Sequence, residues 1–136
     1  MTKLIFVCTG NTCRSPLCES YMKTKYPEAN IYSSGLFVTA YDTSENSQAI
    51  IEKNNLISPD KPTPLTEDEL TDSVLLVMGS HHKEMILSVN PQANVHLLSE
   101  YTTGEQVDVE DPFGGTVAQY EKVFEQLKSY LDKIEL

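Results

Sequence analysis

The chain has 136 residues, a length typical of one domain, and we expect a single domain over residues 1–136. Its formal net charge of −10 argues against a nucleic-acid or anionic-membrane surface, because such a surface needs a basic patch. The sequence has neither a signal-peptide pattern nor a run of about 20 apolar residues, so we expect a cytoplasmic protein that spans no membrane.

In chain order, four short segments rich in apolar residues are expected to form strands: 4–8, 31–34, 74–78 and 95–98. The first is an unbroken apolar run, which is typical of a strand buried on both faces of a parallel sheet. Helical patterns separate the segments, and strands that alternate with helices form parallel sheets through right-handed crossovers. The sequence therefore predicts an α/β fold with a parallel, doubly wound sheet.

Apolar residues at helical spacing predict the intervening helices. The first helix starts near Arg14 and stops at Pro27, and its apolar residues are Leu17, Cys18, Tyr21, Met22 and Tyr26. A second helix over 44–55 is expected to turn Ala49, Ile50 and Ile51 inward. Thr66 is the expected N-cap of a third helix, which begins with the sequence EDEL.

Two more helices are expected in the second half of the chain. Ser80 is the expected cap of a helix that contains Met85, Ile86 and Val89, while His81 and His82 are expected at the surface. A polar loop over 102–115 then leads to a long helix with one apolar stripe, which we interpret as core: Val117, Tyr120, Phe124, Leu127, Leu131 and Ile134.

The three cysteines, Cys8, Cys13 and Cys18, lie close together in the sequence. An odd number of closely spaced cysteines does not match the disulfide framework of a secreted protein. Their spacing does not match a C-x2-C zinc motif, and no second Cys/His cluster follows. We therefore expect no metal site and no cofactor, and we expect Cys18, on the apolar side of the first helix, to pack in the core.

The loop after the first strand contains Gly10 and Asn11, which both tolerate positive φ and so allow several backbone N–H groups to point inward. The helix that starts near Arg14, with Pro16 in its first turn, adds the positive end of its dipole. The loop lies beyond the carboxyl end of a strand, where parallel sheets bind ligands, together with the loops near Gly79 and after Leu98. These features predict a site for an anion such as phosphate.

A cysteine at the edge of such a loop predicts a reaction as well as binding. A helix N-terminus and a nearby cation favour the thiolate form of Cys8, and a thiolate beside a bound phosphate is a nucleophile. Arg14, the only arginine in the chain, can hold two phosphate oxygens at once, which a lysine cannot do. Ser15 can donate a hydrogen bond to the sulfur and stabilise the thiolate as a leaving group.

The pattern C-x5-R-S, from Cys8 to Ser15, resembles the signature of the low-molecular-weight protein-tyrosine phosphatases. Its N-terminal position, the following Pro16, the length of the chain and a late Asp111-Pro112 pair agree with that family. The resemblance covers nearly the whole chain. It implies a four-stranded parallel sheet flanked by helices and a metal-free hydrolase that acts on phosphorylated proteins through a phosphocysteine intermediate. We expect a monomer.

The resemblance also implies roles for single residues. Cys8 is expected to be the nucleophile, and Arg14 is expected to hold the transition state. The expected phosphate-binding loop comprises Thr9, Gly10, Asn11, Thr12, Cys13 and Arg14. Asn11, Ser15 and Ser33 are expected to support the loop and the thiolate. The histidine that often supports this network in the family is missing before the third strand, so its contacts are altered here or supplied otherwise.

A carboxylic acid must protonate the leaving group, and the last loop offers Glu105, Asp108, Glu110 and Asp111. The residues alone favour Asp111 only slightly, because Pro112 stiffens its backbone, and the resemblance decides for Asp111. By the same resemblance, Cys13 traps oxidised Cys8 as a disulfide, and the alternative for Cys13 is simple packing under the loop.

Two positions are similar to the bacterial protein-arginine phosphatases of this family rather than to its usual tyrosine phosphatases. Thr12 stands where an aliphatic residue is common, and Gly114 stands where a second aromatic is frequent, after Phe113, an expected wall of the pocket. The Thr12 hydroxyl adds a hydrogen-bond partner for a guanidinium and removes apolar surface that would pack a phenyl ring, although threonine can equally replace valine as a near-isostere. Phosphoarginine is therefore the favoured substrate, with phosphotyrosine as the alternative.

Three more distant functions stay open at this point. An arsenate reductase of this fold shares the C-x5-R loop, but its relay needs further cysteines and none follows Cys18. A non-catalytic phosphate sensor would need the loop without the thiol. A phosphotyrosine-binding adaptor is possible if Asp111 is not the acid.

Overall fold

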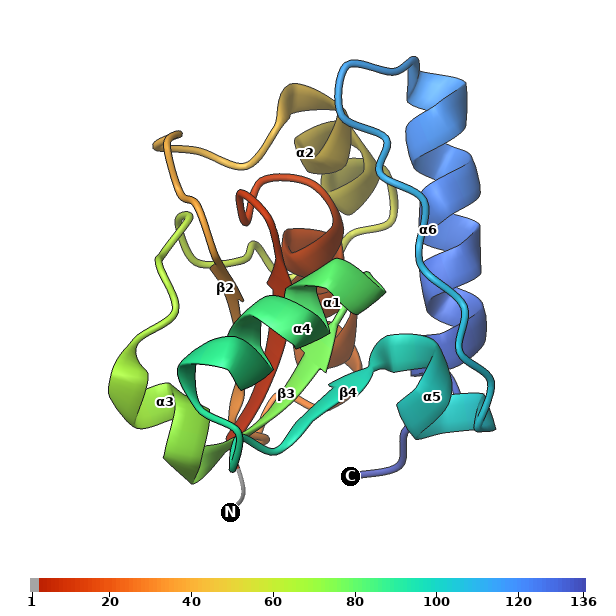
Figure 1. The fold of residues 1–136 in the computed structure, drawn as a ribbon. Coiled ribbons are helices and arrows are strands. Elements are labelled where there is room, and N and C mark those ends of the chain that lie inside the picture. Colours follow the sequence, from red (N-terminus) through yellow and green to blue (C-terminus); the bar gives the residue numbers. More distant parts are fainter. Residues whose placement is uncertain (1–2) are drawn as a thin grey trace.

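The computed structural model describes residues 3–136, so the first two residues of the expected domain lie outside the described part. Four parallel strands form one sheet in the order β2-β1-β3-β4 (Figure 1). They are β1 (Lys3–Cys8), β2 (Ile31–Gly35), β3 (Ser73–Val77) and β4 (Val95–Leu97). β1 lies in the centre, with Cys8 opposite Gly35 on one side and Val7 opposite Val77 on the other. The carboxyl ends of these strands therefore meet at one edge of the sheet. The predicted α/β fold with a parallel sheet is confirmed.

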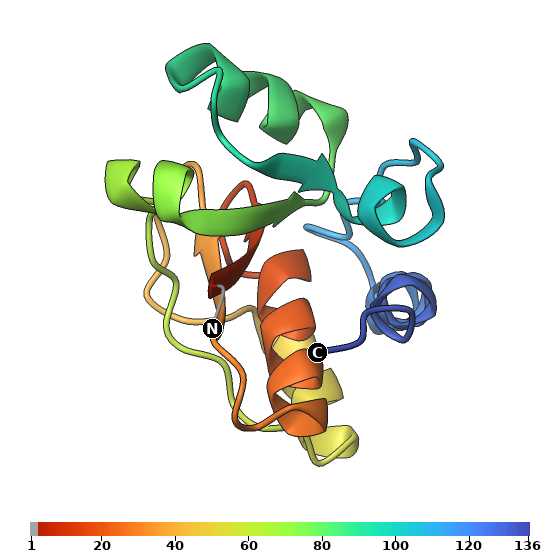
Figure 2. The same ribbon diagram turned by 90° about the horizontal axis from the view of Figure 1, so that it is seen from below.

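Six helices cover the sheet within residues 3–136: α1 (Arg14–Lys25), α2 (Glu45–Lys53), α3 (Glu67–Asp72), α4 (Ser80–Val89), α5 (Leu98–Thr103) and α6 (Val117–Leu131). α1, α2 and α6 lie on one face, and α3 and α4 lie on the other (Figure 2). Phe6 packs in the core of the first face and Ile5 in that of the second, because successive side chains of a strand point to opposite faces. The helices on both faces fix the orientation of β1 and of the loop that follows it.

The start of α3 agrees with the sequence, whereas α2 and α4 differ in detail. Thr66 caps α3 in a reciprocal capping box with Glu69. Ala49, expected to face inward, is exposed, and Ser47 is buried in its place because its hydroxyl donates to the Cys13 carbonyl at 3.2 Å. Gly79 rather than Ser80 is the N-cap of α4.

The buried face of α4 also differs from the expectation. It runs through His82 and Ile86, four residues apart, which share one face of a helix. This orientation leaves Met85 and Val89 exposed at 37% and 68%. His82, expected at the surface, is 1% exposed.

The chain between β4 and α6 contains a helix that the sequence did not predict. α5 begins at Leu98, directly after the three-residue β4, and ends at Thr103, with Gly104 as its C-cap at a φ of 82°. The segment from Gly104 onward then runs alongside α6 toward the carboxyl ends of the strands (Figure 1). α6 buries four residues of the predicted stripe: Tyr120, Phe124, Leu127 and Leu131. Val117 lies in the first turn and is exposed, and Ile134 is buried but lies beyond the end of the helix. None of the helices in the described residues is long and apolar enough to cross a membrane.

Gly35 brings the end of β2 into close contact with the loop after β1. The Leu36 and Phe37 amides donate to the carbonyls of Cys8 and Thr9 at 3.2 and 2.8 Å. A Cβ atom at Gly35 would lie 2.9 Å from both Asn11 N and Thr9 O, which is closer than real Cβ contacts. Backbone atoms cannot move aside as a side chain can, so this position needs glycine for its lack of a side chain.

We expect Gly35→Ala to lower the free energy of unfolding by about 1–3 kcal/mol, the usual cost of overpacking, and to displace the loop after β1. Urea unfolding measures the first effect. Gly10→Ala, in the loop that Gly35 contacts, is a matched control, because its Cβ would meet its nearest atom, Thr12 Oγ1, at an ordinary 3.5 Å. Equal urea midpoints for Gly35→Ala and the unmodified chain would contradict the close approach.

Candidate active site

Asn11 determines the shape of the loop between β1 and α1. Its φ of 56° lies in the left-handed region, which asparagine tolerates better than most residues. Its buried amide Nδ2 donates to Ser15 Oγ at 2.8 Å and to Ser33 Oγ at 2.9 Å, and its Oδ1 accepts from the Thr63 amide at 2.9 Å. These hydrogen bonds connect the loop to α1, to β2 and to the segment before β3.

The direction of these hydrogen bonds follows from Glu19, a fully buried residue of α1. A carboxylate only accepts, so Ser33 Oγ donates to Glu19 Oε1 at 2.5 Å and accepts from Asn11. Asn11 therefore donates one amide hydrogen to Ser33 and the other to Ser15. The hydrogen of Ser15 is left for the Cys8 sulfur, 2.9 Å away, and a donor at that position favours a thiolate.

Partners surround the charge of Glu19. Its Oε2 accepts from Lys23 Nζ at 2.5 Å and from the Asp60 amide at 3.0 Å. A buried carboxylate needs such partners, because desolvation of an unpaired charge is costly. Asp60 and Thr63 both lie in the proline-containing segment before β3, where the histidine that the family often has is missing. Their backbone amides supply contacts to this network, to Glu19 and to Asn11. The i, i+4 spacing of Glu19 and Lys23 was the one signal in the sequence that could have indicated this ion pair.

Arg14 is buried at the first turn of α1, and it points toward the segment before α6. Its Nη1 donates to the Val109 carbonyl at 3.0 Å, and its Nη2 lies 3.6 Å from Asp111 Oδ2. Its Nε is buried and has no hydrogen-bond partner among residues 3–136. Buried donors are nearly always paired, so a free Nε beside a cavity is suited to bind an anion.

A cavity of about 200 Å³ opens over the loop. Its lining residues are Cys8, Thr9, Gly10, Thr12, Cys13, Arg14, Asp111 and Phe113. Asp111 is the one of the four candidate carboxylates that lines it, while Asp108 accepts from the Ser80 amide at 3.0 Å. A larger cavity of about 790 Å³ beside α2 has no cysteine, histidine or arginine in its lining, so the smaller one is the candidate active site.

The other two cysteines differ in their surroundings. The Cys13 sulfur lies 3.6 Å from Thr12 Oγ1 and 3.2 Å from the hydroxyl oxygen of Tyr120. Burial and the contact with Cys13 raise the pKa of Tyr120 to about 12, so its hydroxyl stays protonated. Cys18 packs in the core, where burial raises the pKa of its thiol well above the usual value, in agreement with a packing role. No group of His, Cys, Asp and Glu side chains in the described residues could hold a metal ion.

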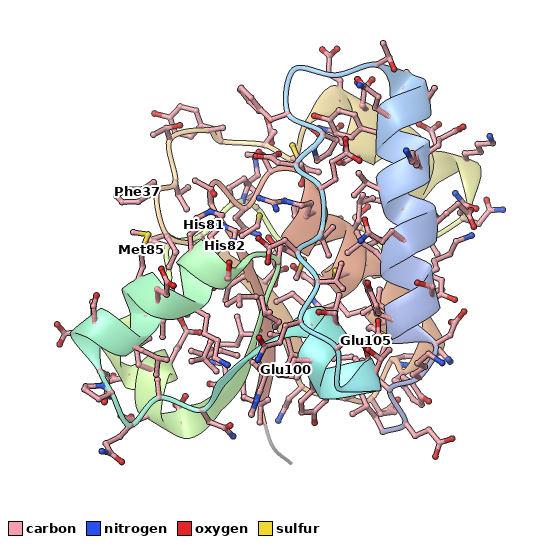
Figure 3. The ribbon with its side chains drawn as sticks, turned by 45° about the vertical axis from the view of Figure 1, so that its right-hand side comes forward. Phe37, His81, His82, Met85, Glu100 and Glu105 are labelled. Atoms are coloured by element: carbon pink, nitrogen blue, oxygen red, sulfur yellow. The ribbon has the colours of Figure 1, made fainter. Side chains whose placement is uncertain are left out.

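His82 reaches the loop from α4, on the opposite face of the sheet from α1 (Figure 3). Its Nδ1 accepts from the Gly79 amide at 3.1 Å, and its Nε2 lies 2.9 Å from Thr9 Oγ1. Burial, followed by the effects of His81 and Arg14, lowers the pKa of His82 from 6.5 to about 4, although Asp111 and Asp108 act in the opposite direction. The imidazole is therefore neutral near pH 7. The only signal in the sequence for the contact between His82 and Thr9 was that His82 follows β3, a strand that ends beside β1.

The low pKa of His82 predicts a pH dependence of stability. Below about pH 6.5 the unfolded chain binds a proton at His82 that the folded chain does not bind, so stability falls as the pH drops toward about 4. We expect His82→Gln to lose this part of the dependence. Urea unfolding of both proteins at a series of pH values isolates it, because the carboxylates titrate in both. Parallel curves for the two proteins would contradict the assignment.

Comparison with known proteins agrees with these features. The family model for low molecular weight phosphotyrosine protein phosphatases matches residues 3–135. The low molecular weight protein-tyrosine-phosphatase PtpB of Staphylococcus epidermidis is 40% identical over 135 residues, which cover 98% of this chain and 96% of that protein. The YwlE arginine phosphatase from Geobacillus stearothermophilus has a TM-score of 0.91 at 28% identity, and the match covers 98% of this chain and 90% of that one.

A second solved structure, of a YwlE arginine phosphatase, is a cysteine-to-serine mutant with a phosphorylated active-site serine. It has a TM-score of 0.90 at 31% identity, and the match covers 97% of this chain and 92% of that one. A family model that spans nearly the whole chain, and a relative at this level of identity, agree with the motif and the fold. The chain therefore belongs to the low-molecular-weight phosphotyrosine protein phosphatase family, whose members are cysteine-based phosphatases.

Proposed function

We propose that this chain is a protein-arginine phosphatase, which hydrolyses phosphoarginine side chains through a phosphocysteine intermediate on Cys8. The observation that carries the proposal is the composition of the cavity. It combines a thiol that accepts a hydrogen bond from Ser15, a buried arginine with a free Nε, and a carboxylate at the rim. Thr12 adds a hydroxyl to the lining of the same cavity, which Phe113 also lines.

In the first step, the Cys8 thiolate attacks the phosphorus atom and the bond from phosphorus to the guanidine nitrogen breaks. The electron pair of that bond goes to the nitrogen, which takes a proton from the carboxylic acid of Asp111. Arg14 and the backbone N–H groups of the loop stabilise the charge on the phosphoryl oxygens. The products of this step are a free arginine side chain and a phosphocysteine.

In the second step, a water molecule attacks the phosphocysteine and gives a proton to the Asp111 carboxylate. The bond from sulfur to phosphorus breaks, inorganic phosphate leaves, and Cys8 returns as a thiolate that accepts from Ser15. The phosphorylated active-site serine of the related cysteine-to-serine mutant supports a covalent intermediate on the residue at this position.

The substrate preference rests on Thr12. Its hydroxyl offers a hydrogen-bond partner to a guanidinium N–H, whereas a phenyl ring gains nothing from a hydroxyl and loses apolar surface. The structural similarity to arginine phosphatases supports this preference. The runner-up is a protein-tyrosine phosphatase, which the names of the Staphylococcus relatives favour.

Rates on peptides that carry either phosphoarginine or phosphotyrosine test the proposal. We expect a higher kcat/KM for phosphoarginine, and we expect Thr12→Ile to lower the ratio of the two kcat/KM values by about tenfold or more. Thr12→Ser, which keeps the hydroxyl, is the matched control for that ratio. Cys8→Ser should abolish turnover of both peptides. A preference for phosphotyrosine in the unmodified protein would establish the runner-up, and turnover by Cys8→Ser would overturn the mechanism.

The role of Asp111 predicts a dependence on the leaving group. Asp111→Asn removes the acid, so kcat should fall by about 100-fold or more for phosphoarginine, whose leaving nitrogen needs a proton. p-Nitrophenyl phosphate has a stable leaving group and should be affected much less. A series of aryl phosphates of increasing leaving-group basicity measures the trend. A loss of the same size for every member would assign the acid to another residue.

A further inference from the structure

The hydrogen bonds of His82 determine which of its ring nitrogens carries the proton. The Gly79 amide donates to Nδ1 at 3.1 Å, so Nδ1 has no hydrogen. A neutral imidazole then carries its hydrogen on Nε2, and Nε2 lies 2.9 Å from Thr9 Oγ1. His82 is therefore the donor and Thr9 the acceptor in that contact.

This contact controls the orientation of the Thr9 hydroxyl. Because Thr9 Oγ1 accepts from His82, its own hydrogen must point elsewhere. Thr9 is exposed and lines the cavity next to Cys8, while His82 is 1% exposed behind it. Since Thr9 lines the cavity, this hydrogen is free to be donated to a group that binds there.

We propose that His82 is a positioning residue of the phosphate site, which holds the Thr9 hydroxyl as a hydrogen-bond donor directed at the bound phosphoryl group. The proposal rests on the proposed function for the identity of the anion. It gives Thr9 a side-chain contact with phosphate in addition to its place in the loop, and it extends the site to α4. His82 does not touch the substrate in this arrangement.

The neutral state of His82 is necessary for this role. A protonated ring would carry a hydrogen on Nδ1, which would face the Gly79 amide hydrogen and break that hydrogen bond. Burial opposes such a proton most strongly, and so do the electrostatic effects of Arg14 and of the His81 ring, whose centroid lies 4.0 Å from that of His82. Asp108 and Asp111 favour the proton but do not outweigh these effects.

Two substitutions at His82 separate its two hydrogen bonds. In His82→Asn, Oδ1 replaces Nδ1 and still accepts from Gly79, but the shorter side chain does not reach Thr9. In His82→Gln, Nε2 replaces the ring Nε2 and still donates to Thr9, while the Gly79 amide loses its acceptor. His82→Asn should therefore lose phosphate affinity, whereas His82→Gln should lose stability.

The first measurement is the binding of inorganic phosphate to each protein by titration calorimetry. We expect about tenfold weaker binding for His82→Asn and for Thr9→Val, the loss typical of one hydrogen bond to a charged group. His82→Gln should lose less than about threefold, but it should unfold at a lower urea concentration than His82→Asn. The double variant Thr9→Val/His82→Asn should bind no more weakly than either single variant, because the two changes remove the same contact.

The outcomes distinguish this proposal from its alternatives. Equal phosphate affinity in His82→Asn and the unmodified chain would overturn it, and so would additive losses in the double variant. A purely structural role of His82 would instead weaken binding in proportion to lost stability, with His82→Gln affected most. Calorimetry requires no turnover, so the result stands apart from the proposed function, which fails if the unmodified protein prefers the phosphotyrosine peptide.

Discussion

The buried amide of Asn11 is the interaction on which the candidate active site depends. A non-glycine residue in the left-handed region costs of order 1–3 kcal/mol and persists only where its surroundings hold it. Here three hydrogen bonds hold it, from α1, from β2 and from the segment before β3. Ser15 on α1 is only four residues from Asn11, but Ser33 and Thr63 are distant in the sequence and reach it only when β2 and the segment before β3 have taken their places beside β1. The shape of the loop is therefore a consequence of the tertiary fold and not of the loop sequence alone.

Two hydrogen-bond networks reach the cavity from opposite faces of the sheet. One starts at the Glu19 carboxylate on α1 and ends at the Cys8 sulfur, and the other starts at the Gly79 amide and ends at the Thr9 hydroxyl. Each begins with a group whose role as donor or acceptor cannot be reversed. The direction of every hydroxyl along the way follows from that first group. Donors that are oriented in advance stabilise a developing charge without reorganisation, which is the condition for strong electrostatic stabilisation.

The sequence predicted the part of the site whose residues are close together in the chain. Cys8 and Arg14 lie on one loop, so their spacing, the adjacent strand and the helix signal were sufficient. Asp111 is distant in the sequence, and the residues alone gave it little advantage over its neighbours. Only the resemblance to a family selected it, and the structure then brought it 3.6 Å from Arg14.

The contacts that the sequence did not reveal depend on backbone groups or on burial. Thr63 and Gly79 donate hydrogen bonds to Asn11 and His82 through their backbone amides. Nearly every residue has a backbone amide, so no residue type in the sequence marks such a contact. His82 was expected at the surface because it stands with His81 at the start of a helix, but its side chain lies on the same buried face as Ile86. α5 was missed since β4 runs into it without a glycine, a proline or a polar cap between them.

Arg14 joins the two halves of the proposed mechanism. Its side chain lines the cavity of the candidate active site, and it also holds the segment that contains Asp111 through the Val109 carbonyl and the ion pair. A phosphoryl group that binds beside Arg14 competes with the Asp111 carboxylate for its hydrogens. Binding would thus weaken the ion pair at the moment when Asp111 is needed at the leaving atom. The Val109 contact keeps the backbone of that segment in place meanwhile, so the acid can change partner without leaving the site.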